Sequence, residues 1–250
     1  MNYDDQFTGK TAFVTGAGSG IGSDIARLLS ARGANVTLVS RSEAPLRELA
    51  DEITEAGGTV FVVPADVSDP RAVEHAVAET VRHFGALHFA VNNAGTSSGY
   101  YELPELPEDE WNKTIGINLS GAYFGMKYQI PAIREAGGGA IVNVSSVFAD
   151  RGLPARAAYS ASKHGLRGLT RTAAAEWSQH GVRINELQPG VIPVPRQQGN
   201  SEEVAKIAER IPARRLGTGT EIAKAVAFLL SEEASYVTGA HLAVDGGYLI

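Results

Sequence analysis

Short apolar segments alternate with amphipathic segments of helical period along the whole of this 250-residue chain. The apolar segments are rich in Val, Ile, Phe and Ala and show little polar alternation, which is typical of strands buried on both faces of a parallel sheet. They occupy residues 11–15, 35–40, 59–64, 87–92, 139–145, 183–188 and 241–244. This rhythm predicts an α/β fold, a Rossmann-type doubly wound parallel sheet of about seven strands with helices on both faces.

Segments of helical period fill the intervals between the apolar runs, at residues 21–31, 43–56, 70–84, 108–136, 157–180 and 220–231. Glycines stand where these helices should end, at positions 33, 57, 58, 85, 137–139 and 181. Because no repeat or linker interrupts the pattern, we expect a single domain over residues 1–250.

The stretch 191–219 is the one irregular region of the sequence. It contains Pro193, Pro195 and Pro212 and a short helical pattern at 202–211. Open α/β sheets bind their ligands where strands end, so we expect this stretch to cover the substrate. A plain surface insertion is the alternative.

Charge and composition exclude several classes of function. A net charge of −6 and a pI of about 5.6 argue against nucleic-acid or membrane partners. The absence of cysteine excludes disulfides and thiolate metal sites, and no histidine cluster suggests any other metal site. The start of the chain does not resemble a secretory signal, and no apolar run approaches the roughly 18 residues that cross a bilayer. A cytoplasmic location follows by default.

A glycine-rich turn lies between the first predicted strand and the first predicted helix. Its residues are Gly16, Gly18, Ser19, Gly20, Ile21 and Gly22. Glycines let backbone N–H groups approach a phosphate closely, and the start of a helix favours negative charge. The spacing Gly-x3-Gly-x-Gly differs from the G-x-G-x-x-G fingerprint. Its place in the first β–α unit nevertheless predicts a binding site for a dinucleotide pyrophosphate.

The end of the second predicted strand bears on the choice of cofactor. Enzymes that use NAD usually place an acidic residue there, for the ribose 2′-hydroxyl. This chain has Ser40, Arg41 and Ser42 instead. A guanidinium at this position can pair with a 2′-phosphate, so the sequence favours NADP(H). NAD(H) remains possible if Arg41 is only a solvated surface charge.

Tyr159 and Lys163 lie four residues apart in a predicted helix, which places both side chains on one face. A nearby cation favours the phenolate, so the tyrosine can exchange a proton near neutral pH. A proton donor next to a hydride cofactor indicates carbonyl reduction or alcohol oxidation.

These features, with several further motifs, resemble the classical short-chain dehydrogenase/reductases over essentially the whole chain. The motifs are the glycine turn 15–22, Asp66-Val67, Asn92-Asn93-Ala94-Gly95, Asn118, Ser145-Ser146, Tyr159-x3-Lys163, Pro189-Gly190 and Asp245-Gly246-Gly247. Each could arise by chance, but their order and spacing together are specific to that family.

The resemblance implies four catalytic residues. Tyr159 would be the general acid/base that protonates the carbonyl oxygen, and Ser146 would hydrogen-bond the same oxygen. Lys163 would hold the nicotinamide ribose and lower the pKa of Tyr159. Asn118 would anchor a water molecule in a proton relay to solvent.

The resemblance also implies the remaining cofactor contacts. Asp66 and Val67 would bracket the adenine, and Asn92, Ala94 and Gly95 would line the cofactor at the end of the fourth strand. Pro189, Gly190 and Ile192 would hold the nicotinamide. The family often has a threonine two residues after Ile192, where this chain has Val194 followed by Pro195.

The predicted function is hydride transfer between NADP(H) and a small or medium ketone, hydroxy-ketone or sugar-like alcohol. A 3-oxoacyl thioester reductase is the alternative enzyme, and a catalytically silent dinucleotide sensor is the alternative from another class. An anionic group of the substrate could meet Arg151, Arg156 or Arg196, although nothing in the sequence places them in the site. The resemblance further implies a homotetramer, in which the helices 108–136 and 157–180 pack across one interface.

Overall fold

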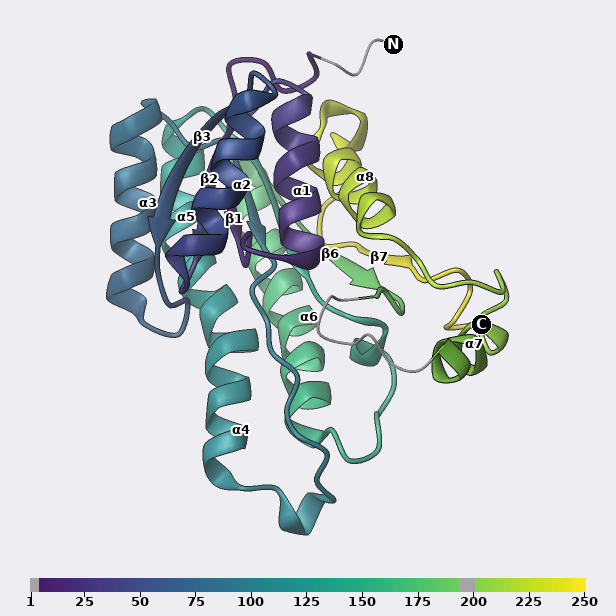
Figure 1. Ribbon diagram of the computed structural model, residues 1–250. Helices are drawn as coiled ribbons and strands as arrows, with labels where there is room; N and C mark the ends of the chain where they lie inside the picture. Colours follow the sequence, from purple (N-terminus) through teal and green to yellow (C-terminus); the bar gives the residue numbers. More distant parts are fainter. Residues whose placement is uncertain (1–4, 194–200) are drawn as a thin grey trace.

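Seven parallel strands form one sheet in the computed structural model, which describes residues 5–193 and 201–250 (Figure 1). The strands are β1 (Thr11–Thr15), β2 (Asn35–Ser40), β3 (Thr59–Pro64), β4 (Phe89–Asn92), β5 (Gly139–Val144), β6 (Val182–Pro189) and β7 (His241–Val244). Their order is β3-β2-β1-β4-β5-β6-β7, and every neighbouring pair is parallel. The connections reverse direction between β1 and β4, which is the place where such sheets bind ligands.

The predicted fold class is confirmed, and β1, β2, β3 and β7 have the predicted bounds. The other strands differ at their ends. β4 starts two residues later than predicted, β5 ends one residue earlier, and β6 is one residue longer at each end. Strand ends are set by hydrogen bonding to neighbours rather than by the apolar pattern, so these are the positions that the pattern determines least.

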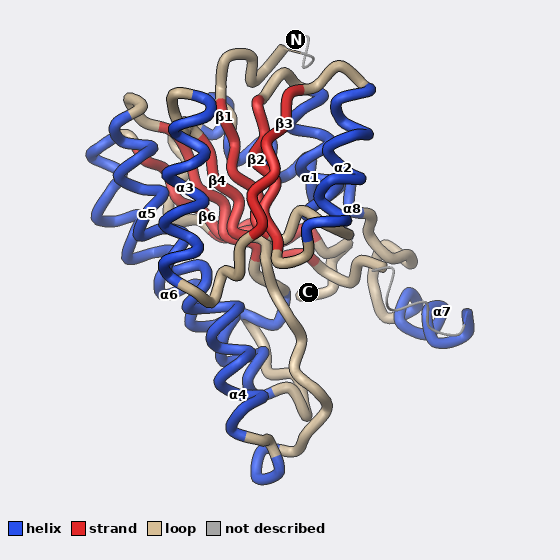
Figure 2. The backbone as a smooth tube through the Cα atoms, turned by 60° about the vertical axis from the view of Figure 1, so that its left-hand side comes forward, coloured by secondary structure: helices blue, strands red, loops and turns tan. Residues whose placement is uncertain are grey.

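Helices cover both faces of the sheet (Figure 2). α1 (Gly20–Ala31), α2 (Glu43–Glu55) and α8 (Gly219–Leu230) pack their apolar side chains on one face. α3 (Pro70–Phe84), α5 (Gly121–Glu135) and α6 (Ala157–Trp177) cover the other. α4 (Glu108–Ile115) projects beyond the sheet, and α7 (Ser201–Glu209) stands apart from it (Figures 1 and 2). In the described ranges, no helix is long and apolar enough to cross a membrane.

Local sequence explains where several helices begin and end. Asp69 caps α3 by accepting a hydrogen bond from the Arg71 N–H at 2.9 Å, and Pro70 takes the first helical position. Gly85 ends α3 in the left-handed conformation, at φ 83°. Thr218 and Glu221 form a reciprocal capping box at the start of α8.

The predicted helix 108–136 is not continuous, which corrects the sequence prediction. A π-helical turn, Gly116–Ser120, separates α4 from α5. Similarly, α6 ends at Trp177 and a 3₁₀ turn, Ser178–His180, completes the predicted range. Side-chain periodicity does not distinguish an α-helical turn from a π turn, and such turns often occur at functional sites.

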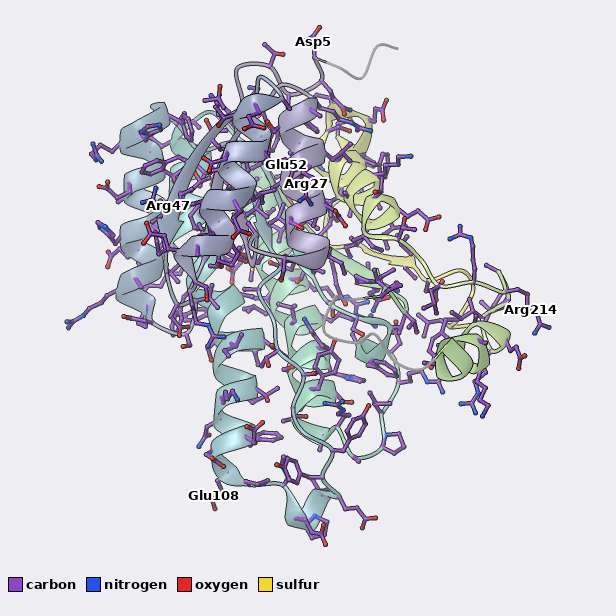
Figure 3. The ribbon with its side chains drawn as sticks, in the orientation of Figure 1. Asp5, Arg27, Arg47, Glu52, Glu108 and Arg214 are labelled. Atoms are coloured by element: carbon purple, nitrogen blue, oxygen red, sulfur yellow. The ribbon has the colours of Figure 1, made fainter. Side chains whose placement is uncertain are left out.

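The two helices next to the glycine turn are also joined at the surface. Arg27 of α1 donates to both carboxylate oxygens of Glu52 of α2, at 2.7 and 2.8 Å (Figure 3). An exposed pair of this kind contributes at most about 1 kcal/mol. The orientation of α1 and α2 therefore rests mainly on buried side chains such as Ile25, Leu46 and Leu49.

Candidate active site

The carboxyl ends of the strands bring distant parts of the sequence to one edge of the sheet. The Ala17 N–H donates to Val39 O at 3.2 Å, which joins the glycine turn to the end of β2. The Ser145 N–H donates to Leu187 O at 2.7 Å, which joins the ends of β5 and β6. Because every strand pair is parallel, all the predicted motifs that follow strands lie along this edge.

The glycine turn has the shape of a phosphate cradle. Gly16 and Gly20 have φ values of +67° and +57°, which favour glycine. A Cβ on Gly22 would lie 2.1 Å from the Gly16 carbonyl oxygen, so the backbone approach there requires glycine. Ser19 precedes α1 without making a side-chain cap, which leaves the first N–H groups of the helix to a ligand. The turn therefore fits a dinucleotide pyrophosphate.

Thr15 and Asn93 fix the glycine turn to the end of β4, a contact that the sequence analysis missed. The Thr15 hydroxyl oxygen accepts from the N–H groups of Asn93 and Ala94, both at 3.0 Å. The Asn93 amide donates in return to Thr15 O at 3.0 Å. The signal in the sequence was a polar residue at or just after the end of each of the two strands. The local sequence does not show that Thr15 and Asn93 are in contact.

Asn92 differs from the expected arrangement. Its side chain is buried, donates to Gln129 and Asn143 at 3.1 and 2.9 Å, and accepts from Gln129 at 2.9 Å. The side chain therefore points into the interior, between β4, β5 and α5. Only the backbone of Asn92 is left for the cofactor contact that the resemblance implied.

The ends of β2 and β3 present the residues expected near the adenosine. Arg41 is exposed and makes no ion pair or side-chain hydrogen bond within the described ranges. Burial disfavours the charged form of Asp66, but hydrogen bonds from Ser68 and the nearby charge of Arg41 outweigh this and lower its pKa. Val67 is buried and lies against the start of α5, where a Cβ on Gly121 would be 2.9 Å from it. A Cβ on Gly18 would lie 3.2 Å from the Ser40 hydroxyl, so the glycine turn reaches this end of β2.

Ser146 and Tyr159 come together from different elements. Ser146 follows β5, and Tyr159 lies in the first turn of α6. Burial raises the pKa of the Tyr159 phenol, whereas the Ser146 hydroxyl and the charge of Arg156 act to lower it. The net shift is upward, and the effect of Lys163 on this pKa, which the resemblance implied, stays a prediction.

Lys163 is buried beside the same site. Its ammonium donates to Val144 O at 3.0 Å and lies 5.7 Å from the centre of the Tyr159 ring. Burial lowers the pKa of Lys163 to about 8, although the charge of Glu186 opposes this. A Cβ on Gly95 would lie 3.8 Å from the Lys163 ammonium and 3.5 Å from the Asn118 amide oxygen, so these three predicted residues meet.

Asn118 lies in the π-helical turn between α4 and α5. Its amide oxygen accepts from Thr96 N at 2.8 Å, and its amide nitrogen donates to Thr96 O at 2.9 Å and to Ser162 at 3.1 Å. The side chain thus fastens the segment after β4 to α6. Because these bonds occupy the side chain, only the backbone of Asn118 is left for the water contact that the resemblance implied.

An ion-pair network, buried at Glu186 and exposed at Asp150, lies next to Lys163 and was not foreseen. Arg167 of α6 pairs with Asp150 and, at 3.0 Å, with Glu186 of β6, which is 1% exposed. The Arg167 hydrogen bonds lower the pKa of Asp150 to about 2. Glu186 and Gln188 are polar residues in an apolar strand, and a buried carboxylate normally has a partner. The network ties the loop after Ser146 to β6.

The nicotinamide end of the predicted site lies at the end of β6. A Cβ on Gly190 would lie 2.6 Å from Asp245 Cα, so Pro189-Gly190 packs against the segment after β7. Ile192 contacts the return of the chain at Gly217, where a Cβ would be 2.5 Å away. Val194, Pro195 and Arg196 lie outside the described residues, and the covering role of 191–219 stays a prediction.

Removing the charge of Lys163 is expected to stabilise the fold and to abolish activity. The folded protein loses this proton near pH 8, whereas the unfolded chain keeps it to about 10.4, so the charge destabilises the fold below pH 8. Lys163→Met should raise the free energy of unfolding at pH 7 by about 1–3 kcal/mol. Urea denaturation should show this gain shrinking as the pH rises from 8 to 10. A variant less stable than wild type at pH 7 would contradict the prediction.

A glycine turn that fits a pyrophosphate at the switch point of a parallel sheet, with a tyrosine beside a serine and a lysine at the same edge, is typical of a nicotinamide-dependent oxidoreductase. Comparisons with known proteins narrow this class. A family model described as Enoyl-(Acyl carrier protein) reductase matches residues 16–249. Cyclohexanol dehydrogenase from Acinetobacter sp. (strain SE19) is 41% identical, covering 98% of this chain and 96% of its own.

Two further relatives agree. Cis-4-hydroxycyclohexanecarboxylate dehydrogenase from Sinomonas cyclohexanicum is 40% identical over 98% of both chains. The crystal structure of levodione reductase superposes with a TM-score of 0.92 at 36% identity, over 96% of this chain and 98% of that one. The chain belongs to the short-chain dehydrogenase/reductase family, as its motifs predicted, and this family uses NAD(P)(H).

Proposed function

We propose that this protein transfers a hydride between NADP(H) and a secondary alcohol or ketone on a compact, cyclic substrate. The observation that carries the proposal is the meeting of Ser146 and Tyr159 at the edge that holds the glycine turn. The relatives support the substrate class, since the named substrates of two of them contain a cyclohexane ring.

The residues of the site divide the reaction between them. When bound, the nicotinamide supplies or accepts the hydride at the substrate carbon. Tyr159 gives a proton to the developing alkoxide during reduction and takes it back during oxidation. Ser146 donates a hydrogen bond to the same oxygen, where negative charge builds up. Lys163, close to both Tyr159 and Gly95, holds positive charge beside the phenol.

A substrate panel tests the proposal. The purified protein is supplied with NADPH and, separately, cyclohexanone, diketones, keto-sugars and 3-oxoacyl thioesters, and cofactor oxidation is followed by absorbance. Fastest turnover of cyclic ketones supports the proposal. Preference for the thioesters would instead support the alternative of a 3-oxoacyl thioester reductase. No turnover of any member would favour a dinucleotide sensor.

Arg41 is proposed to select NADP(H) over NAD(H). Its exposed guanidinium makes no ion pair or side-chain hydrogen bond within the described ranges, and it can pair with the 2′-phosphate. Arg41→Ala is expected to weaken NADPH binding by about 10- to 100-fold and to change NADH binding by less than about twofold. Fluorescence titration of both cofactors measures this difference. Equal losses for the two would contradict the role, and Arg47→Ala on α2, whose partner Glu43 is exposed, serves as the control.

A further inference from the structure

Arg156 occupies a tightly fixed backbone position just before α6. Its N–H donates to Leu153 O at 3.1 Å, and its carbonyl accepts the first helical hydrogen bond, from Ser160 N at 3.0 Å. The preceding Ala155 has a φ of +59°, which is costly for a residue with a Cβ, and its carbonyl accepts from Tyr101 N at 3.1 Å. These hydrogen bonds fix the backbone at Arg156, and they therefore also fix the direction in which its side chain leaves the backbone.

The side chain of Arg156 is a buried cation without a counter-ion. The residue is 8% exposed, and its guanidinium stacks on the ring of Tyr100, 3.6 Å from the ring centre. Within residues 5–193 and 201–250 it makes no ion pair and no side-chain hydrogen bond. A buried charge is normally paired, because an unpaired one loses its hydration without compensation.

The position of Arg156 on the helix adds to this cost. Arg156 is the residue that caps α6, a 21-residue helix with no acidic side chain in its first turn and no side-chain cap. The start of a helix carries partial positive charge, so it disfavours a cation and favours an anion. Both the guanidinium and the helix start would therefore be stabilised by one negatively charged group.

Arg156 also lies close to the reacting group. It immediately precedes α6 and is three residues before Tyr159, so the Cα atoms of the two residues lie no more than about 11 Å apart. Its charge acts on the Tyr159 phenol. A single small molecule can thus reach the phenol with one end and the guanidinium with the other.

We propose that Arg156 binds a carboxylate of the substrate, whose alcohol or ketone group reacts at Tyr159. A guanidinium fits a carboxylate with two parallel hydrogen bonds, and Tyr100 covers its other side. The substrate class is then a cyclic hydroxy or keto acid with its carboxylate on the far side of the ring. This inference rests on the proposed function and specifies its substrate.

The neighbouring residues Arg167 and Arg151 are not buried cations without a counter-ion. Arg167 is paired with Asp150 and Glu186. Arg151 is exposed, with its guanidinium 5.4 Å from the centre of the Tyr248 ring. Arg151 is therefore a suitable control position, since it lies in the same loop region but carries no buried charge.

The test compares an acid with its ester. Initial rates are measured with NADPH and either 4-oxocyclohexanecarboxylate or its methyl ester, for wild type, Arg156→Gln and Arg151→Gln. The ratio of kcat/KM for acid over ester should fall by about 10- to 100-fold in Arg156→Gln. It should stay within about twofold in Arg151→Gln. Any effect of the substitution on Tyr159 changes the rates with acid and ester equally, so it cancels in the ratio.

The outcomes separate this inference from the proposed function. If Arg156→Gln turns over both compounds with an unchanged acid-to-ester ratio, the carboxylate site is overturned and the proposed function stands. The same conclusion follows if only Arg151→Gln loses the preference for the acid. If no ketone is turned over, the proposed function fails, and calorimetric binding of cyclohexanecarboxylate to the NADPH-loaded protein decides the site. Binding that Arg156→Gln weakens by at least about tenfold supports it, and equal binding overturns it.

Discussion

Tyr159→Phe is expected to reduce kcat for ketone reduction by about 10²- to 10⁴-fold, the usual contribution of a general acid. The substitution removes the phenolic hydroxyl, which interacts with Ser146, and leaves the half-buried ring in place. NADPH affinity should change by less than about twofold, because no group that we assign to the glycine turn is altered. Steady-state kinetics and fluorescence titration of NADPH measure the two quantities.

The control for this prediction is a second removal of a phenolic hydroxyl. Tyr123→Phe changes a side chain on α5 that is 46% exposed, and it should leave both kcat and NADPH affinity unaltered. Loss of NADPH binding in Tyr159→Phe would make the residue structural. Retention of more than about a tenth of the wild-type kcat would mean that another group supplies the proton.

The second large effect is expected at the glycine turn, from the addition of one carbon atom. A Cβ on Gly22 would lie 2.1 Å from the Gly16 carbonyl oxygen and 2.6 Å from the Asn93 amide nitrogen. The turn and its link to β4 must therefore shift, at a cost of about 1–3 kcal/mol in the free energy of unfolding. NADPH binding should weaken by at least about 100-fold, since phosphate binding depends on the aligned N–H groups of this turn. Urea denaturation and NADPH titration of Gly22→Ala measure the two effects.

Gly168→Ala is the matched control for Gly22→Ala. Gly168 is an exposed residue within α6, and a Cβ there would meet no atom within 4 Å. Alanine should therefore stabilise the helix by up to about 1 kcal/mol without changing cofactor affinity. Wild-type NADPH affinity in Gly22→Ala would show that the pyrophosphate binds elsewhere.

Local patterns were enough to predict most of the sheet and the grouping of the candidate catalytic residues. Buried parallel strands are continuous apolar runs, so each of the seven strands could be recognised without knowing its neighbours. The spacing of Tyr159 and Lys163 needs only the helical period. Ser146 was predicted from the family motif. It follows β5, whose carboxyl end lies at the same edge of the sheet as the glycine turn.

The details that escaped prediction depend on contacts between distant residues. The side chain of Asn92 turns inward because Gln129 and Asn143 accept its hydrogen bonds there. The side chain of Asn118, in the π turn, is hydrogen-bonded to the backbone of Thr96, 22 residues earlier in the chain. A sequence shows that such residues are polar, but it does not show which partner each of them finds.

The environments of the charged residues around α6 also depend on contacts between distant residues. The sequence left Arg151, Arg156 and Arg196 as equal candidates to meet an anionic group of the substrate. The fold buries Arg156 without a counter-ion among the described residues and leaves Arg151 exposed. The raised pKa of Tyr159 was also unforeseen, since burial acts from all sides of the residue. The spacing of residues in the sequence predicts only which side chains are neighbours on the same helix.

The packing of Gly190 against Asp245 joins the end of β6 to the segment that follows β7. A Cβ on Gly190 would lie 2.6 Å from Asp245 Cα, and the Asp245 carboxylate accepts hydrogen bonds from the N–H groups of Gly247 and Leu249. β7 pairs with β6 along Glu186–Pro189, so it covers the outer side of that strand. Removal of residues 241–250 would therefore leave β6 as an unpaired edge strand, whose free backbone groups favour association with another chain.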